Sequence, residues 1–422
     1  MNSVINYICS PGLGHLDNSL PIIIELKKYT KKKSNIFFVK ESLVNHLINN
    51  PTLHNIHKKT FDKNYIQVKS MILSSPELKK IYTLINNKIL KLFIFKFLIP
   101  LRLKSFYLPI FKNLNIEIFS LKELFNTKDI VVFDPYEIIQ KKKYFYPIYS
   151  LIKNNFKIGI RHGIGNDQII KKKNSNQKIK INFNNLIYLS HSKKQSTYVQ
   201  NKIKISKKKI LNSGVLKFSN KWKNEIEKKA FNIKSKEKDK FVYIISRHTT
   251  NYFKLEKKIY LIKLLKKVLI EKFKLKLIIK FHPKEDPITS YEIYKRCLGE
   301  KDFNKTWFIY NHHSFKICKI CKFGVSFVSS VALDLLSYKK LTIEIINLDN
   351  KSSNYEISFV KNKLVLIPKN LIHFEKIIEK ILKKKIKHNC FKNFNKLYYN
   401  PKNLNTLKTI NKHYNEYCCN LR

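Results

Sequence analysis

The chain has 422 residues, of which 84 are basic and 29 acidic, so its formal net charge is +55 at pH 7. An apolar content of 44% with 13% aromatic residues excludes a disordered chain, and the length predicts two domains of about 150 to 200 residues each. The basic excess is nearly all lysine and is spread along the chain, as an AT-rich genome would produce. Because such a charge attracts nucleotides, anionic lipids and nucleic acids alike, it does not select a function by itself.

The first half of the chain alternates short apolar runs with helical patterns. A β-rich run at residues 4–9 is followed by a glycine turn at 11–15 and a helical pattern at 18–29. The further elements expected are strands at 36–39, 130–133, 156–160 and 186–190 and a helix at 41–48. Apolar runs without alternation are typical of a parallel sheet covered by helices on both faces. We therefore predict a Rossmann-like domain over residues 1–217.

Two polar clusters of this half follow predicted strands. Their members are Gly12, Gly14, His15 and Asp17 in the first turn, and Arg161, His162 and Gly163 after the strand at 156–160. The first turn resembles a dinucleotide fingerprint only loosely, because it lacks the third glycine. His15, Asp17 and His162 are the candidate catalytic bases, although Asp17 is equally suited to cap the helix that follows it. The glycines and Arg161 are expected to line the cleft, where glycine permits close approach to the backbone.

The segment at residues 92–111 combines apolar residues with cations and contains no acid. It is interrupted by Lys96, Pro100, Arg102, Lys104 and Pro109, which leaves no apolar stretch long enough to span a bilayer. Such a segment fits an anionic membrane interface, and it fits equally a buried helix pair whose lysines snorkel to the surface. Both interpretations stay open, and the first predicts a peripheral position at the inner face of the plasma membrane.

The seven cysteines form no spaced disulfide framework, and no apolar secretion signal opens the chain. We therefore expect a reducing, cytoplasmic setting. Cys318 and Cys321 have the spacing of half a zinc site, but no second pair lies nearby in the sequence. This favours two cysteines packed in or near a helix, and no metal site is predicted.

A charged segment at residues 218–240 separates the first domain from a second alternating pattern. The second pattern predicts strands at 241–246, 275–281, 307–310, 324–328 and 341–346 and helices at 255–273 and 331–338. It indicates a second Rossmann-like domain over 241–385, followed by a helical tail at 386–422 that packs back on the first domain. The predicted fold class is α/β, with two doubly wound domains facing a cleft.

Phosphate-binding candidates of the second domain follow its predicted strands. They are Arg247, next to His248, after the strand at 241–246, then His282, Pro283 and Lys284 after 275–281, and Ser329 and Ser330 before the helix at 331–338. Ligands of open parallel sheets bind beyond the carboxyl ends of the strands, where arginine and a helix start both favour phosphate. Two simpler alternatives are that Ser330 only caps its helix and that His282 is an ordinary loop residue.

With His282-Pro283 and Ser329-Ser330 placed after strands, the chain resembles two-domain glycosyltransferases of the GT-B architecture. The resemblance is to the bacterial surface-carbohydrate group of sialyltransferases, capsule polymerases and glycerophosphotransferases. In that group a His-Pro pair and a Ser-Ser or Ser-Thr pair bind the activated donor, often a cytidine nucleotide. The acidic pair followed by glycine that sialyltransferases of the group often use as the base does not occur in this sequence. The resemblance therefore does not identify the base.

The resemblance implies metal-independent transfer of a sugar or related group from a nucleotide-activated donor, such as a CMP-linked sugar, to a surface glycan or lipid-linked acceptor. It implies no cofactor, because the nucleotide-sugar is a substrate. A nucleotide-sugar epimerase of similar two-domain shape is the first alternative. The second alternative, a basic nucleic-acid-binding protein, has no supporting zinc array, aromatic-basic motif or recognition helix in the sequence. We therefore expect no specific nucleic-acid partner.

Overall fold

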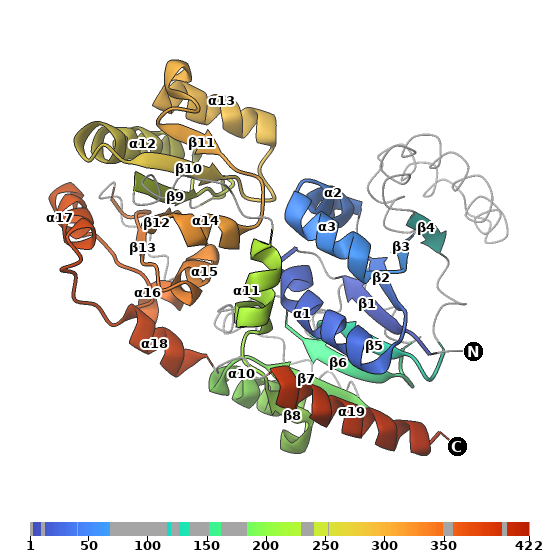
Figure 1. Cartoon of the computed structure of the whole chain (residues 1–422). Helices are drawn as coiled ribbons and strands as arrows, with labels where there is room; N and C mark the ends of the chain where they lie inside the picture. Colours follow the sequence, from blue (N-terminus) through green and yellow to red (C-terminus); the bar gives the residue numbers. More distant parts are fainter. Residues whose placement is uncertain are drawn as a thin grey trace. The chain divides into compact units, whose positions relative to one another are not determined.

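The computed structural model divides the chain into two compact units (Figure 1). The first unit comprises Met1–Ser219 and Tyr398–Arg422, and the second comprises Asn220–Leu397. The residues whose structure is described are 3–9, 13–39, 41–67, 116–119, 126–135, 152–161, 184–228, 240–251, 253–348, 358–398 and 403–421. The segment 92–111, Gly12, His162 and Gly163 lie outside these ranges.

The first unit is built on an eight-stranded sheet with the order β4-β3-β2-β1-β5-β6-β7-β8. Its strands, all paired in parallel, are β1 (Ile5–Cys9), β2 (Ser34–Phe38), β3 (Lys63–Gln67), β4 (Ile116–Phe119), β5 (Ile130–Phe133), β6 (Phe156–Ile160), β7 (Leu186–Ser190) and β8 (Ile210–Asn212). The helices include α1 (Leu13–Thr30), α2 (Glu41–Ile48), α3 (Pro51–Thr60), α10 (Lys193–Tyr198) and α19 (Asn403–Cys419). The apolar strands β1, β5, β6 and β7 are buried along their whole length, as parallel sheets require.

The second unit contains a five-stranded sheet with the order β11-β10-β9-β12-β13. Its strands, also paired in parallel, are β9 (Phe241–Ile245), β10 (Lys276–Lys280), β11 (Trp307–Ile309), β12 (Phe323–Ser326) and β13 (Thr342–Glu344). The helices are α11 (Asn220–Glu227), α12 (Leu255–Leu265), α13 (Pro287–Leu298), α14 (Ser314–Ile320), α15 (Val331–Ser337), α16 (Ser358–Lys361), α17 (Leu371–Leu382) and α18 (Cys390–Leu397). Tyr243, Ile278, Ile317 and Leu335 belong to a buried cluster that joins this sheet to α14 and α15.

Both units alternate strands and helices in parallel sheets, which confirms the predicted α/β fold class with two Rossmann-like domains. Two of the predicted helices differ in detail from the structure. Helix α1 begins at Leu13, so part of the predicted glycine turn is helical. Helix α12 continues as a π-helical stretch at Lys266–Lys272, whereas a single regular helix was expected. None of the helices in the described ranges is long and apolar enough to cross a membrane.

Helix α11 lies inside the range 218–240 that the sequence analysis predicts as a linker. Its residues Trp222 and Ile226 are buried. Glu227, at its end, accepts hydrogen bonds from the Tyr338 hydroxyl and the Lys319 ammonium, both over 2.6 Å. These contacts make α11 part of the second unit.

The predicted tail at 386–422 is divided between the two units, with α18 in the second and α19 in the first. Helix α19 is held by tyrosine hydroxyls. Tyr414 donates to the Lys128 carbonyl over 2.8 Å, and Tyr417 donates to the carbonyls of Thr127 and Asn154 over 2.6 and 2.7 Å. These carbonyls precede β5 and β6, so this part of α19 contacts the amino ends of the two strands.

The close packing of β6 makes Gly159 a sensitive position. A Cβ atom there would lie 2.6 Å from Pro135 Cγ and 2.9 Å from Tyr188 Cδ2. Because the proline ring cannot rotate away, Gly159→Ala should destabilise the protein by about 1–3 kcal/mol. The matched control is Gly14→Ala at an exposed position of α1, where alanine should stabilise the helix by up to about 1 kcal/mol. Urea denaturation measures both changes, and an unaffected Gly159→Ala protein would contradict the packing.

Candidate functional site

The second unit brings three polar strand ends together at one edge of its sheet. The strand order reverses between β9 and β12, and β10 lies on the other side of β9. Since the strands are parallel, their carboxyl ends share the edge where ligands of such sheets bind. The predicted site residues that follow them are Arg247 after β9, His282, Pro283 and Lys284 after β10, and Ser329 and Ser330 after β12.

Arg247 joins the ends of β9 and β12. Its guanidinium Nη1 donates a hydrogen bond to the main-chain carbonyl of Val328. The N–H of Val328 donates to Glu344 Oε2 over 2.8 Å, and the N–H of Ser329 donates to Ser326 Oγ over 3.0 Å. The loop that carries the two serines is therefore fixed by groups from β9, β12 and β13.

The two serines differ in their surroundings. Ser329 is 9% exposed, and its Oγ accepts the N–H of Val331 over 3.4 Å. Ser330 is exposed, and its side chain makes no capping hydrogen bond to α15. The structure therefore gives no support to the alternative that Ser330 only caps its helix. Its exposed hydroxyl follows β12 at the edge that also carries Arg247.

His282 and His248 place two imidazole rings side by side. The ring centroids are 4.7 Å apart. His282 Nδ1 accepts the N–H of Lys284 over 3.1 Å, so in the neutral ring the proton lies on Nε2, which is then a hydrogen-bond donor. Burial and the nearby positive charges of Lys284 and Arg247 lower the pKa of His248. The sequence analysis gave His248 no role of its own, because only the folded structure shows that its ring lies against that of His282.

A buried carboxylate, Glu285, holds the loop that carries His282. Glu285 Oε2 accepts the His282 N–H over 2.5 Å. Its Oε1 accepts the Ser246 hydroxyl over 3.0 Å and pairs with the Lys258 ammonium, and the side chains of this ion pair are only 2% and 3% exposed. Tyr294 donates to Ser246 over 3.0 Å. Satisfied buried polar networks rigidify the segments they join, so these contacts anchor the His282 loop to β9 and α12.

Pro283 and Lys284 are the exposed part of the same loop. The N–H of Glu285 donates to the His282 carbonyl over 2.8 Å, which closes a turn with Pro283 at its first corner. The ammonium of Lys284 acts on His248, since its charge contributes to the lowered pKa of that histidine. The turn therefore adds a cation to the same edge of the sheet.

In the first unit, the candidate base His15 lies in the core. Its ring has no exposed surface, with Nδ1 2.9 Å from the Tyr7 hydroxyl and Nε2 3.1 Å from the Ile160 carbonyl. A general base needs a nitrogen within reach of its substrate. Both ring nitrogens are engaged inside the protein, so the geometry gives His15 the role of tying α1 to β1 and β6.

Asp17, Gly14 and Arg161 are the other described candidates of the first unit. Gly14 is exposed, and Asp17 lies inside α1, so it does not cap this helix. Asp17 Oδ2 lies 3.5 Å from Lys217 Nζ, and both side chains are largely buried. Arg161 follows β6 and borders a cavity of about 20 Å³, which has room for about one water molecule. The cavity is also lined by Asn18, Ile160, Leu189, His191, Ser213, Gly214, Val215 and Leu216.

Asp134 is a further candidate that the sequence analysis did not identify. It follows β5 directly, at the point where the strand order of the first sheet reverses between β1 and β5, and it is 1% exposed. Asp134 lies near Tyr7 of β1, because its negative charge contributes, after burial and the charge of Cys9, to the raised pKa of Tyr7. A carboxylate at a reversal of strand order occupies the position where such sheets bind ligands. In the sequence, Asp134 can be recognised as an acidic residue placed directly between the apolar run at 130–133 and Pro135.

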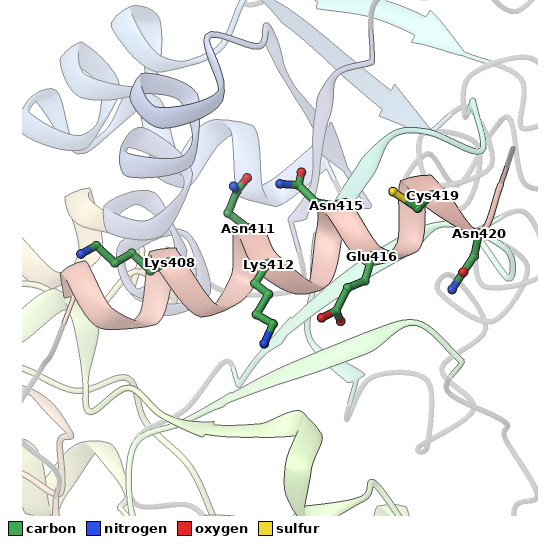
Figure 2. Close-up of a pocket in the computed structure, with 7 residues that line it drawn as sticks. All are labelled: Lys408, Asn411, Lys412, Asn415, Glu416, Cys419 and Asn420. Carbon is green, nitrogen blue, oxygen red and sulfur yellow. The ribbon is translucent and has the colours of Figure 1, made fainter.

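An open hollow of about 870 Å³ runs along α19. Figure 2 shows that its lining side chains come from this one helix and from Asn420, which follows it directly. They are Lys408, Asn411, Lys412, Asn415, Glu416, Cys419 and Asn420. Tyr414 and Tyr417 of the same helix contact the amino ends of β5 and β6, whereas ligands of parallel sheets bind at the carboxyl ends. We therefore do not assign this hollow to the candidate site.

Comparison with known proteins supports the fold. No family model matches the chain, and no curated protein matches its sequence. Among solved structures, S. aureus MnaA in a co-structure with UDP is similar with a TM-score of 0.56 at 10% identity, over 99% of this chain and 98% of that one. A UDP-N-acetylglucosamine 2-epimerase reaches 0.53 at 11% identity, over 97% and 95% of the chains. A variant of the wall teichoic acid polymerase TagF reaches 0.51 at 13% identity, over 98% and 89%. These similarities show the two-domain GT-B fold.

The buried Glu344 predicts a pH-dependent stability. Burial raises its pKa from 4.5 to about 7, although the N–H groups of Val328 and Ile346 and the charge of Arg247 act in the opposite direction. Between these values the folded protein binds more protons than the unfolded chain, so the stability falls as the pH rises through this window and levels off above it. Urea denaturation of wild type and Glu344→Gln from pH 4.5 to 8 should show the difference in their unfolding free energies declining by at most about 1.4 kcal/mol per pH unit. Parallel pH profiles of the two proteins would contradict the prediction.

Proposed function

We propose that the protein is a glycosyltransferase that moves a sugar or related group from a nucleotide-activated donor to a hydroxyl of an acceptor. The proposal is carried by one observation, the meeting of Arg247 with the Val328 loop and of His248 with His282 at the carboxyl ends of three neighbouring strands. Guanidinium, imidazole N–H and hydroxyl groups are donors suited to phosphate oxygens. Their place at the reversal of strand order supports a nucleotide site.

The side chains at this edge fit the chemistry of donor activation. Transfer leaves negative charge on the phosphate that departs with the nucleotide. Arg247 and Lys284 supply positive charge, and His282 Nε2 is a hydrogen-bond donor available in the neutral ring. Donors held in place before the reaction stabilise such charge without reorganisation. The proposal therefore requires no metal ion, and the nucleotide-sugar is a substrate rather than a cofactor.

The group that deprotonates the acceptor hydroxyl belongs, in this proposal, to the first unit. Asp134 lies at the reversal of strand order but is only 1% exposed, so it is proposed on its position in the sheet and not on its accessibility. Asp17 is less suited, because it is paired with Lys217, and His162 remains a candidate from its sequence position alone. Either carboxylate, Asp134 or Asp17, would act as a general base.

The acceptor is proposed to be a surface glycan or a lipid-linked carbohydrate. A wall teichoic acid polymerase is among the proteins of similar fold, and its structure was also determined after a soak with CDPG. The proposal includes action at the cytoplasmic face of an anionic membrane, with which the net charge of +55 is compatible although it does not select this partner over other anions. The sugar and the linkage are not part of the proposal.

A nucleotide-sugar epimerase is the second candidate function, favoured by the similar fold of a UDP-N-acetylglucosamine 2-epimerase. An epimerase needs only the nucleotide-sugar, whereas a transferase also needs an acceptor. Incubation with UDP-N-acetylglucosamine alone, followed by chromatography of the sugar, separates the two. We expect an unchanged sugar, and an isomerised sugar in the absence of acceptor would favour the epimerase.

The donor site can be tested by titrating CDP and UDP into the protein in a calorimeter. One of the two should bind to wild type, and His282→Ala should weaken its binding about ten-fold or more, because a hydrogen bond to a charged phosphate is lost. His373→Ala is the matched control. His373 Nδ1, like that of His282, accepts a backbone N–H over 3.1 Å, but His373 lies on α17. Equal affinity of wild type and His282→Ala, or no binding to wild type, would overturn the donor site.

A further inference from the structure

Val328 has a backbone conformation that its side chain disfavours. Its φ is 63°, in the left-handed region, and it is the one β-branched residue with a positive φ among the described residues. The other non-glycine residues in this region are lysines and asparagines. Branching at Cβ makes the left-handed conformation a genuine outlier. Such a conformation persists only where the surrounding structure imposes it.

Both polar groups of Val328 are bound by charged side chains from neighbouring strands. Its N–H donates to Glu344 Oε2 over 2.8 Å, and its carbonyl accepts from the Arg247 guanidinium. The other oxygen of Glu344 accepts the N–H of Ile346 over 3.2 Å. Glu344 is 4% exposed, and Val328 is 5% exposed. The carboxylate is therefore buried and bound to backbone N–H groups, whereas Ser330 is exposed.

The two hydrogen bonds that hold Val328, called the clamp below, also influence the serines, because Val328 lies directly before them in the chain. It stands between the end of β12 and Ser329, so its φ sets the direction in which the chain leaves the sheet. Ser329 then folds back through its N–H to Ser326 Oγ, and Ser330 follows as an exposed residue. With a negative φ at Val328, the two serines would leave the strand in another direction.

We infer that Glu344 is a positioning residue of the donor site, which holds Val328 in the left-handed conformation and thereby places Ser329 and Ser330 for the phosphate. The inference rests on the proposed function for its ligand. Glu344 itself does not contact the nucleotide. Its effect on binding passes through the backbone of Val328.

Val328→Gly tests whether Glu344 acts through the backbone of Val328, because glycine adopts a positive φ without the hydrogen bond from Glu344. The proteins compared are wild type, Glu344→Gln, Val328→Gly and the double variant, each titrated with CDP and UDP. The glutamine side chain has one acceptor oxygen for the two N–H groups, so Glu344→Gln should weaken nucleotide binding about ten-fold. In the Val328→Gly background the same change should weaken binding less than about three-fold, because the clamp is no longer needed. An equal loss in both backgrounds would overturn the inference.

Unfolding in urea separates the two claims: absence of nucleotide binding to wild type would overturn the donor site, whereas the unfolding data test by themselves whether Glu344 holds the backbone of Val328. For each glutamine substitution, the measured quantity is the unfolding constant of the variant divided by that of the protein in which the substitution is made, wild type or Val328→Gly. Glu344→Gln should raise the unfolding constant at least about five-fold more in wild type than in the Val328→Gly background. The matched control is Glu227→Gln, since Glu227 binds Tyr338 and Lys319 in the same unit. Its effect should be equal in both backgrounds, and a Glu344→Gln effect that is also equal would contradict the positioning role.

Discussion

The hydrogen bond from the Arg247 guanidinium to the Val328 carbonyl is the interaction on which the candidate site depends. A parallel sheet brings the carboxyl ends of β9 and β12 to one edge, but it does not fix the loops that follow them. Arg247 connects these loops across the point where the strand order reverses. This hydrogen bond joins the cation after β9 directly to the loop that carries the serines after β12, which Glu344 and Ser326 also hold.

The two loops of the candidate site are held by the same kind of interaction, in which a buried carboxylate accepts a backbone N–H of the loop. Glu344 accepts the N–H of Val328, and Glu285 accepts the N–H of His282. Each carboxylate is buried and lies near a cation, which is Arg247 for Glu344 and Lys258 for Glu285. A buried carboxylate is stable only when its oxygens are hydrogen-bonded or paired. The burial that makes these groups sensitive to substitution therefore also makes the loops rigid, as pre-organised binding requires.

The sequence predicted the strands that carry the candidate residues. Continuous apolar runs marked β9, β10 and β12, and Arg247, His282 and the two serines follow these strands as expected, while their role in binding stays a prediction. The sequence could not show which carboxylates support the loops, because Glu285 meets Lys258 and Glu344 meets Val328 only in the folded chain. His15 was misleading for the same reason, since the core that surrounds it comes from β1 and β6. The strands β3, β4 and β8 were missed because they lack a marked apolar run.

A crystal structure of the protein with the nucleoside diphosphate that binds it, CDP or UDP, would test the central claim most directly. The account predicts that the phosphates lie at the carboxyl ends of β9, β10 and β12, within hydrogen-bonding distance of Arg247, His282 Nε2 and the hydroxyl of Ser330. A nucleotide bound elsewhere, such as in the hollow along α19, with this edge of the sheet unoccupied, would contradict it.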